Sequence, residues 1–387
     1  MRGQDTTFRR RRLVPQIIVA LWLPLCFAFA GANQQFLPDK YFADSKYIQS
    51  LAMVATGPSS DSFVTTAWIY RALGAFEYPP ITQLVTVAFF FITAFSCAPW
   101  LEVSRFTLLE VLLFCFCGAE AAIYLAQFSK ESIIVLVVLV LVVMPKTAAG
   151  DVPFVAIACI YAYTIRDYWF IVAALYVAFR FLLRLKKPVM ILIFVVVALL
   201  CLAVGASVAL GLSLNSFRQA VAQFNSLYAN TAIQNYVPVK GPLGVAANDL
   251  CTLALLIIPL PLLRSSAPTY LAFAGLMTVL WINLFYVVYK GMRKKWFVLD
   301  VRLSRAVSML LAMLVVQSIF EPDYGSYIKH LTPLLPLFFF VLRARRELKI
   351  ATTQHAKQDS RNSQEDDHID VTNGSRPRAL HRQPGPS

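Results

Sequence analysis

The sequence predicts an all-α, polytopic helical membrane protein. Of its 387 residues, 58% are hydrophobic and only 14% are charged, and the mean hydropathy is +0.63. One soluble core cannot bury so much apolar surface, so lipid is the expected solvent for most of the chain. The apolar stretches are continuous rather than alternating, which favours spanning helices over the strands of an outer-membrane barrel.

About 10–11 apolar segments divide the chain. Several are shorter than the ~20 residues that a helix needs to cross a bilayer, so we expect flanking turns or neighbouring helices to complete them. The segments lie at residues 13–33, 81–100, 106–128, 132–145, 152–165, 168–183, 188–213, 250–263, 269–289, 306–320 and 331–342.

Basic residues between the segments predict the orientation. The positive-inside rule assigns the basic groups at 9–12, 184–187 and 290–295 to the cytoplasm, together with Arg343, Arg345 and Arg346. Both termini are then inside, which requires an even number of crossings, so one of the eleven segments does not span. We expect segment 250–263 to be re-entrant, because its two prolines break the helix.

The domain organisation follows from this orientation. A basic cytoplasmic N-terminus (1–12) precedes a membrane domain (13–346) with outer loops at 34–80 and 214–249, and a cytoplasmic tail (347–387) follows. The tail has few large apolar residues and is expected to be disordered. The first apolar segment also resembles a cleavable signal peptide, which is the alternative interpretation of the N-terminus.

Several classes of function have no support in the sequence. The seven cysteines lie within or at the ends of apolar segments, and none forms a metal-ligand spacing with a histidine, so we expect neither disulfides nor a metal site. No phosphate-binding loop or nucleophile elbow is present, and no cofactor is expected. The net charge of +14 is explained by topology and anionic membrane lipid, and it does not indicate nucleic-acid binding.

Polar residues gather instead in the predicted outer turns. The run 321–330 places two carboxylates, an amine, an imidazole and two phenols at the membrane edge, where polar groups are costly and seldom kept without a use. Other turns add Lys130 with Glu131 and the run 166–169, and the long outer block adds Arg218. We interpret this set as a cavity for an anionic, polyhydroxylated substrate.

The residue types predict the roles. Arg166, Arg218 and Lys329 suit a phosphate or pyrophosphate, and His330 or a carboxylate suits a base that accepts a hydroxyl proton. The expected sugar-binding residues are Glu321, Tyr324, Tyr327, Asp167, Trp169, Lys130 and Asp44. The alternative is that the charged pairs only cap turns and that the aromatic residues form an interfacial belt.

Three short motifs follow apolar segments: Ser129-Lys130-Glu131, Arg166-Asp167-Tyr168-Trp169, and Pro322-Asp323-Tyr324-Gly325-Ser326-Tyr327 with Lys329-His330. They resemble motifs of bacterial polysaccharide polymerases of the Wzy and EpsG-like kind. The resemblance implies a multi-pass protein of the bacterial inner membrane that moves a growing glycan from undecaprenyl pyrophosphate to another polyprenyl-linked repeat unit on the extracytoplasmic face. It further implies phosphate contacts from Arg166 and Arg218, with Lys329 as an auxiliary cation, and His330 or Asp323 as the base. No metal is required, and other polysaccharide-assembly proteins are possible partners.

Two alternatives remain at this point. A GT-C-type glycosyltransferase using a polyprenyl-phosphate sugar would carry an acidic pair in its first outer loop, for which Asp39 and Asp44 are candidates. A lipid-linked glycan or small-molecule transporter would contain interrupted helices, for which segment 250–263 is the only indication.

Overall fold

Helices make up almost all of the chain in the computed structural model, which describes residues 2–211, 213, 214, 216, 218, 231–237, 241–264 and 267–348. The extended pairing found in these residues is a single antiparallel bridge between Ala232 and Asp323. The predicted all-α class is therefore confirmed. Two compact units are present, Met1–Leu342 and Arg343–Ser387. The second is described only to residue 348, so most of the predicted disordered tail lies outside the described residues.

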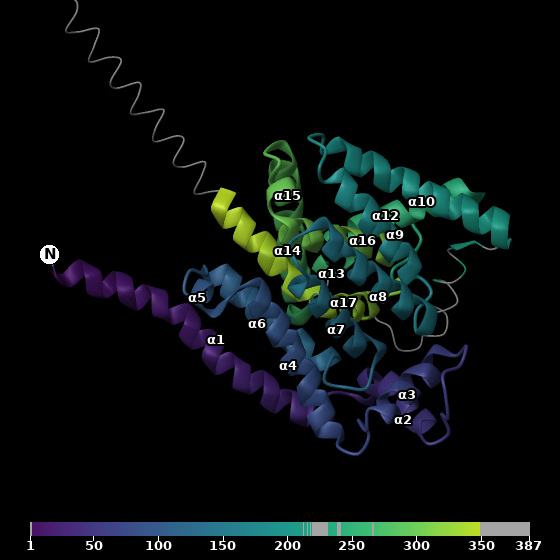
Figure 1. The fold of residues 1–387 in the computed structure, drawn as a ribbon, viewed down its shortest axis with the longest axis horizontal. Helices are drawn as coiled ribbons and strands as arrows, with labels where there is room; N and C mark the ends of the chain where they lie inside the picture. Colours follow the sequence, from purple (N-terminus) through teal and green to yellow (C-terminus); the bar gives the residue numbers. More distant parts are fainter. Residues whose placement is uncertain are drawn as a thin grey trace, which may run out of the picture. The chain divides into compact units, whose positions relative to one another are not determined.

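Figure 1 shows the elements of the first unit. In chain order they are α1 (Arg2–Phe36), η1 (Asp39–Phe42), α2 (Ala43–Ala52), α3 (Ser62–Ala72), α4 (Pro79–Cys97), α5 (Trp100–Val103), α6 (Leu108–Tyr124), α7 (Lys130–Val143), η2 (Ala148–Gly150), α8 (Asp151–Thr164), α9 (Trp169–Leu182), α10 (Val189–Leu210), α12 (Gly241–Ile257), α13 (Leu260–Leu263), α14 (Pro268–Arg293), α15 (Trp296–Leu299), α16 (Val301–Phe320), α17 (Tyr324–Leu331) and η3 (Thr332–Leu337).

Six helices in the described part of the chain are long and apolar enough to cross a bilayer, which makes this a multi-pass membrane protein. They are Leu13–Phe36, Pro79–Cys97, Val189–Ala209, Pro268–Arg293, Val301–Phe320 and Tyr324–Leu348. The other five predicted segments form the shorter helices α6, α7, α8 and α9 and the pair α12–α13. Helices α7, α8 and α9 are as short as the sequence indicated, whereas α6 is shorter than the predicted segment 106–128.

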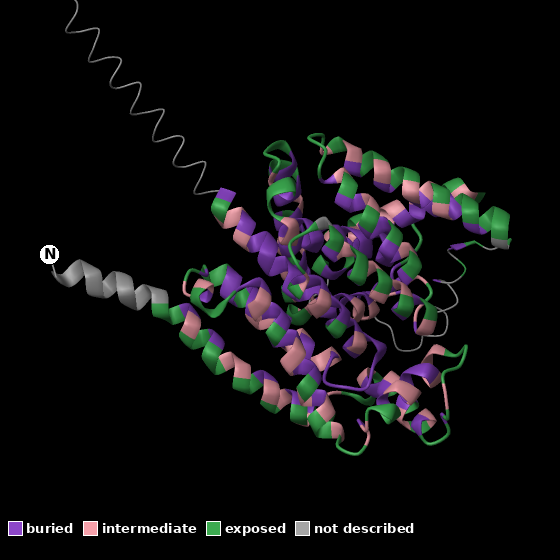
Figure 2. Ribbon diagram, in the orientation of Figure 1, coloured by how far each residue is buried: buried purple, intermediate pink, exposed green. Residues whose placement is uncertain are grey.

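Helix α16 forms the centre of the packing. Its apolar window is 94% buried, against 22% for those of α1 and α10, and Figure 2 shows this contrast between a buried interior and exposed outer helices. Helices α7, α9 and α12 pack on α16. Polar residues such as Ser304, Ser308 and Gln317 are buried on it, so α16 faces protein on all sides. Its two ends are therefore the places where charged groups of several elements can meet.

The predicted interruption at the first proline of segment 250–263 is present. Helix α12 ends at Ile257, Pro259 follows, and α13 begins at Leu260. However, α12 starts at Gly241 rather than near residue 250, so Asp249 lies within a helix and not in the expected loop. Proline at the second helical position favours this earlier start, because the missing N–H is not needed in a first turn.

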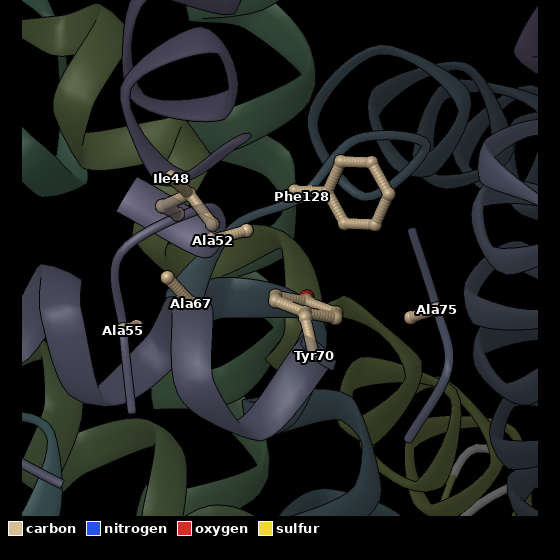
Figure 3. Packing of buried hydrophobic residues seen from close by; sticks show 7 residues of the cluster. All are labelled: Ile48, Ala52, Ala55, Ala67, Tyr70, Ala75 and Phe128. Carbon is tan, nitrogen blue, oxygen red and sulfur yellow. The ribbon is translucent and has the colours of Figure 1, made fainter. Parts of the chain in front are cut away.

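The segment 39–72 forms a small helical layer of its own. Asp61 caps α3 by accepting a hydrogen bond from Phe63 N at 2.7 Å. Ile48 of α2 and Tyr70 of α3 pack in one apolar cluster with Phe128, which precedes α7 (Figure 3). This cluster, together with the hydrogen bond from Tyr70 Oη to Ser129 O (2.8 Å), holds the layer beside the start of α7.

Candidate functional site

Glu131, in the first turn of α7, is the centre of a buried ionic group. Ser129 caps this helix, and only 1% of the Glu131 side chain is exposed. The carboxylate forms an ion pair with Arg166, and its Oε1 lies 3.2 Å from His330 Nε2. One carboxylate therefore joins the turn between α8 and α9 to α17.

Arg166 supplies a fixed positive charge to this group. Its Nη1 donates to Tyr168 Oη at 2.7 Å and lies 2.8 Å from His330 Nε2. Burial alone would lower the pKa of Arg166, but Glu131 and the Tyr168 hydroxyl outweigh that effect and raise it well above its ordinary value. The guanidinium therefore stays charged at every physiological pH.

The surrounding hydrogen bonds determine the tautomer of His330. Because a guanidinium can only donate, Nε2 of His330 accepts from Arg166. The ring proton then lies on Nδ1 and is donated to Glu321 Oε1, at 2.6 Å. Both ring nitrogens are thus engaged. We refer to Glu131, Arg166, Glu321 and His330 as the Glu131 cluster.

Two lysines beside the Glu131 cluster are bound by the segment 39–72. Lys329 forms an ion pair with Asp44 of α2. Lys130 Nζ donates to Ser62 Oγ at 2.7 Å and lies 3.4 Å from the centre of the Phe63 ring. The helical layer α2–α3 thus contacts both lysines beside the cluster and supplies the carboxylate that pairs with Lys329.

A cavity of about 280 Å³ adjoins the Glu131 cluster on the α16 side. Its walls come from the end of α16, the start of α17 and the turn before α9, and the Tyr168 and Phe320 rings in its lining stack with their centroids 5.6 Å apart. The lining residues are Tyr168, Val316, Gln317, Phe320, Glu321, Pro322, Ser326 and His330. Two members of the Glu131 cluster therefore face a space that can hold a ligand.

Four of the predicted site residues instead have structural contacts. Asp323 caps α17 by accepting from Ser326 N at 2.9 Å, and burial raises its pKa. The hydroxyls of Tyr324 and Tyr327 donate to the carbonyls of residues 255 and 256 at the end of α12. Trp169 is fully buried and packs edge-on against another aromatic ring. The Asp323 contact matches the alternative interpretation of capping, whereas the three aromatic residues are buried in protein and do not form the interfacial belt of that alternative.

Two more candidates lie apart from the Glu131 cluster. Asp167 is exposed in the turn after α8. Arg218 is buried in a second group, where it donates to Thr252 Oγ1 at 2.7 Å and to Asn235, and Asp249 Oδ1 lies 3.8 Å from its Nη1. The structure thus brings together His330, Arg166, Lys329, Glu321, Lys130 and Asp44, whereas Arg218 pairs with a different carboxylate.

Sequence reasoning placed Glu131 in an outer turn but did not select it as a site residue, and it did not select Gln317. The motif Ser129-Lys130-Glu131 contained the signal for Glu131, because a carboxylate two residues after a capping serine lies in the first turn of the helix. Gln317 offered no such signal, since it is one polar residue within a long apolar run.

A further buried network, absent from the sequence predictions, lies at the opposite end of α8 and α16. Asp151 Oδ1 accepts from Arg305 Nε at 2.6 Å, and its Oδ2 accepts from Arg180 Nε and Nη2 at 3.0 and 2.9 Å. Arg305 also donates to the carbonyls of residues 144, 145 and 147, and Arg180 to Ser304. We call Asp151, Arg180 and Arg305 the Asp151 network.

Among the residues that the structure describes, no group of three or more His, Cys, Asp or Glu side chains is placed to hold a metal ion. No protein-family model matches this sequence, and neither a curated protein nor a solved structure is detectably similar to it. The function is therefore argued from the site itself.

Proposed function

We propose that this protein polymerises lipid-linked glycan repeat units on the extracytoplasmic face of a bacterial inner membrane. The observation that carries the proposal is the Glu131 cluster, which combines a fixed cation with carboxylates and a histidine beside a cavity. Polar groups at this depth in a membrane protein are costly and indicate a functional site. The motif resemblance to Wzy and EpsG-like polymerases supports the choice of reaction.

The proposed transfer needs a base, a cation and no cofactor. The oxygen of an acceptor hydroxyl forms a bond to the anomeric carbon of the donor glycan, and the bond from that carbon to undecaprenyl pyrophosphate breaks. The electron pair leaves with the pyrophosphate, and the hydroxyl proton passes to the base. Fixed cations stabilise the departing charge.

Glu321 is the best-placed base. Its Oε1 accepts from His330, whereas its Oε2 is buried and has no hydrogen-bond partner in the described part of the protein. His330 has no free nitrogen in this arrangement, and Asp323 is occupied as a helix cap. We therefore assign proton acceptance to Glu321 and orientation of its carboxylate to His330.

Lys329 is the best-placed phosphate ligand. Its partner Asp44 has 42% of its side chain exposed, against 1% for Glu131, the partner of Arg166. A pyrophosphate can replace the accessible Asp44 and form a charge-assisted contact with Lys329. Arg166 stays bound to Glu131 and contributes its positive field.

The glycosyltransferase alternative is less well supported by the geometry. Asp39 and Asp44 bind different lysines, because Asp39 pairs with Lys46 at 2.8 Å on the surface and Asp44 pairs with Lys329. They do not form the acidic pair that this alternative expects.

The glycans that accumulate in a deletion strain test the proposal. We expect single, complete lipid-linked repeats, and long chains restored by the wild-type gene but not by a Glu321→Gln variant. Truncated repeats would indicate a glycosyltransferase that completes the unit. Unchanged glycan length and composition would refute the proposed function.

A further inference from the structure

Two residues that line the cavity beside the Glu131 cluster carry buried hydrogen-bond acceptors without donors. Glu321 Oε2 and Gln317 Oε1 are both buried and have no partner in the described part of the protein, and both residues line the cavity. Glu321 is 3% exposed and Gln317 is 1% exposed. Buried polar atoms are nearly always paired, so two unpaired acceptors on one cavity indicate a ligand that donates.

The orientation of the Gln317 amide supports this conclusion. Its Nε2 donates to the main-chain carbonyl of Tyr327 at 3.1 Å. Reversing the amide would place an oxygen against that carbonyl, so the hydrogen-bond network assigns Oε1 to the unpaired position. The unpaired atom of this cavity-lining residue is therefore an acceptor, and a ligand that pairs with it must supply an N–H or O–H group.

The other residues of the cavity wall indicate the polarity, charge and size of the ligand. Val316, Pro322 and the stacked rings of Tyr168 and Phe320 form an apolar surface around the two acceptors. The carboxylate of Glu321 disfavours an anion, so a phosphate group does not suit this space. The volume of about 280 Å³ lies at the small end of the range for ligand pockets, which suits a single ring.

We infer that this cavity binds a single neutral sugar ring, which packs against Tyr168 and Phe320 and donates hydroxyl groups to Glu321 Oε2 and Gln317 Oε1. A pyranose combines apolar C–H faces with outward hydroxyl donors, as these walls require. That the ring is the terminal sugar of the glycan acceptor rests on the proposed function. Its hydroxyl then lies beside the base, while the pyrophosphate lies toward Lys329.

Saturation-transfer difference NMR on the full-length protein in nanodiscs tests this inference. The probes are the methyl glycosides of glucose, galactose, mannose, rhamnose and N-acetylglucosamine, with cyclohexanol as an apolar comparison. We expect the wild-type protein to transfer saturation to at least one glycoside, which shows that the glycoside binds. Gln317→Leu should weaken its affinity by about threefold to tenfold, the loss expected for one hydrogen bond. Ser326→Val, which fills the cavity but keeps both acceptors, should also weaken it.

Gln127→Leu is the matched control. Gln127 is likewise buried with an unpaired Oε1, but it does not line the cavity, so its replacement should leave the signal unchanged. The inference is overturned if no glycoside is saturated by the wild-type protein, if cyclohexanol alone is, or if the cavity variants retain the wild-type signal. Should Gln317→Leu fail to fold, Ser326→Val decides alone.

The two proposals fail separately. Glycoside binding with unchanged polysaccharide in the deletion strain would refute polymerisation and leave a sugar site. Accumulated single repeats without glycoside binding would support polymerisation and place the acceptor elsewhere.

Discussion

The Glu131 cluster and the Asp151 network lie at opposite ends of the same helices and differ in how completely their polar atoms are paired. Arg305 is near the start of α16 and Glu321 follows its end, roughly 24 Å away at 1.5 Å per residue. In the Asp151 network, no buried side-chain atom of its three residues lacks a partner in the described structure. In the Glu131 cluster, Arg166 Nε and Glu321 Oε2 both lack one.

This difference separates a structural role from a functional one. Arg305 holds the chain between α7 and α8 through three carbonyls, and its charge is opposed by Asp151. Such a network has no unpaired polar side-chain atom, within the described structure, that could bind a ligand. The Glu131 cluster is also held together at Glu131, yet one of its unpaired atoms belongs to Glu321, which lines a cavity. We therefore expect mutations in the first region to change stability and mutations in the second to change activity.

The largest expected effect is the loss of stability in Arg305→Met. The change leaves Asp151 with Arg180 and the Tyr176 hydroxyl as partners, and it removes the donor from three carbonyls. Breaking a buried ion pair from one side costs about 3–5 kcal/mol, so the protein should lose most of its folded yield and denature at a lower temperature. Thermal unfolding in detergent, followed by size-exclusion chromatography, measures this.

Arg302→Met is the control for that prediction, because Arg302 lies on the same helix but is only half-buried. This substitution should lower the free energy of unfolding by less than about 1 kcal/mol. Equal losses in the two variants would show that the Asp151 network has no special structural role.

The sequence predicted more of the Glu131 cluster than of the Asp151 network, and the reason is physical. Arg166, Lys329 and His330 interrupt apolar runs at turns, where a charge is conspicuous. Their partners are set by helix packing across long separations in the chain, so the contact of Arg166 with Glu131 was not predictable from local pattern. Arg180 and Arg305 lie within or beside apolar segments and resemble ordinary interfacial charges, and only the packing of α9 on α16 reveals their common partner.

The next largest effect compares the Glu131 cluster with the Asp151 network through two equivalent changes, each of which replaces a carboxylate by its amide. Glu131→Gln keeps the shape and one acceptor but removes the charge that opposes Arg166, so we expect polymer synthesis to fall about 100-fold, equivalent to about 2.7 kcal/mol in the barrier. Asp151→Asn should reduce synthesis only in proportion to the folded protein. Polymer formed per amount of folded protein, measured in vitro, distinguishes the two. An equal specific activity for both variants would contradict the division of roles.

A smaller effect is expected from Gly150→Ala, which tests how tightly the Asp151 network is packed. A Cβ at this position would lie 2.4 Å from Pro145 O and 2.5 Å from Arg305 Nη2. Overpacking of this kind costs about 1–3 kcal/mol. In Gly205→Ala, the control, the new Cβ has no neighbour within 4 Å, so stability should be unchanged or slightly higher. Tolerance of both substitutions would mean that the network can shift to make room.

The smallest change in stability is expected at the accessible edge of the Glu131 cluster, in Asp44→Asn. Because Asp44 is partly exposed, its pair with Lys329 should contribute only about 0–1 kcal/mol. The substitution frees Lys329 for pyrophosphate, so the KM for the lipid-linked donor should fall while kcat stays the same. Asp39→Asn alters a comparable carboxylate–lysine pair outside the cluster and should change neither constant. If Asp44→Asn instead abolishes transfer, the Asp44 carboxylate takes part in the chemistry, as a GT-C-type enzyme requires, and Lys329 is not the phosphate ligand.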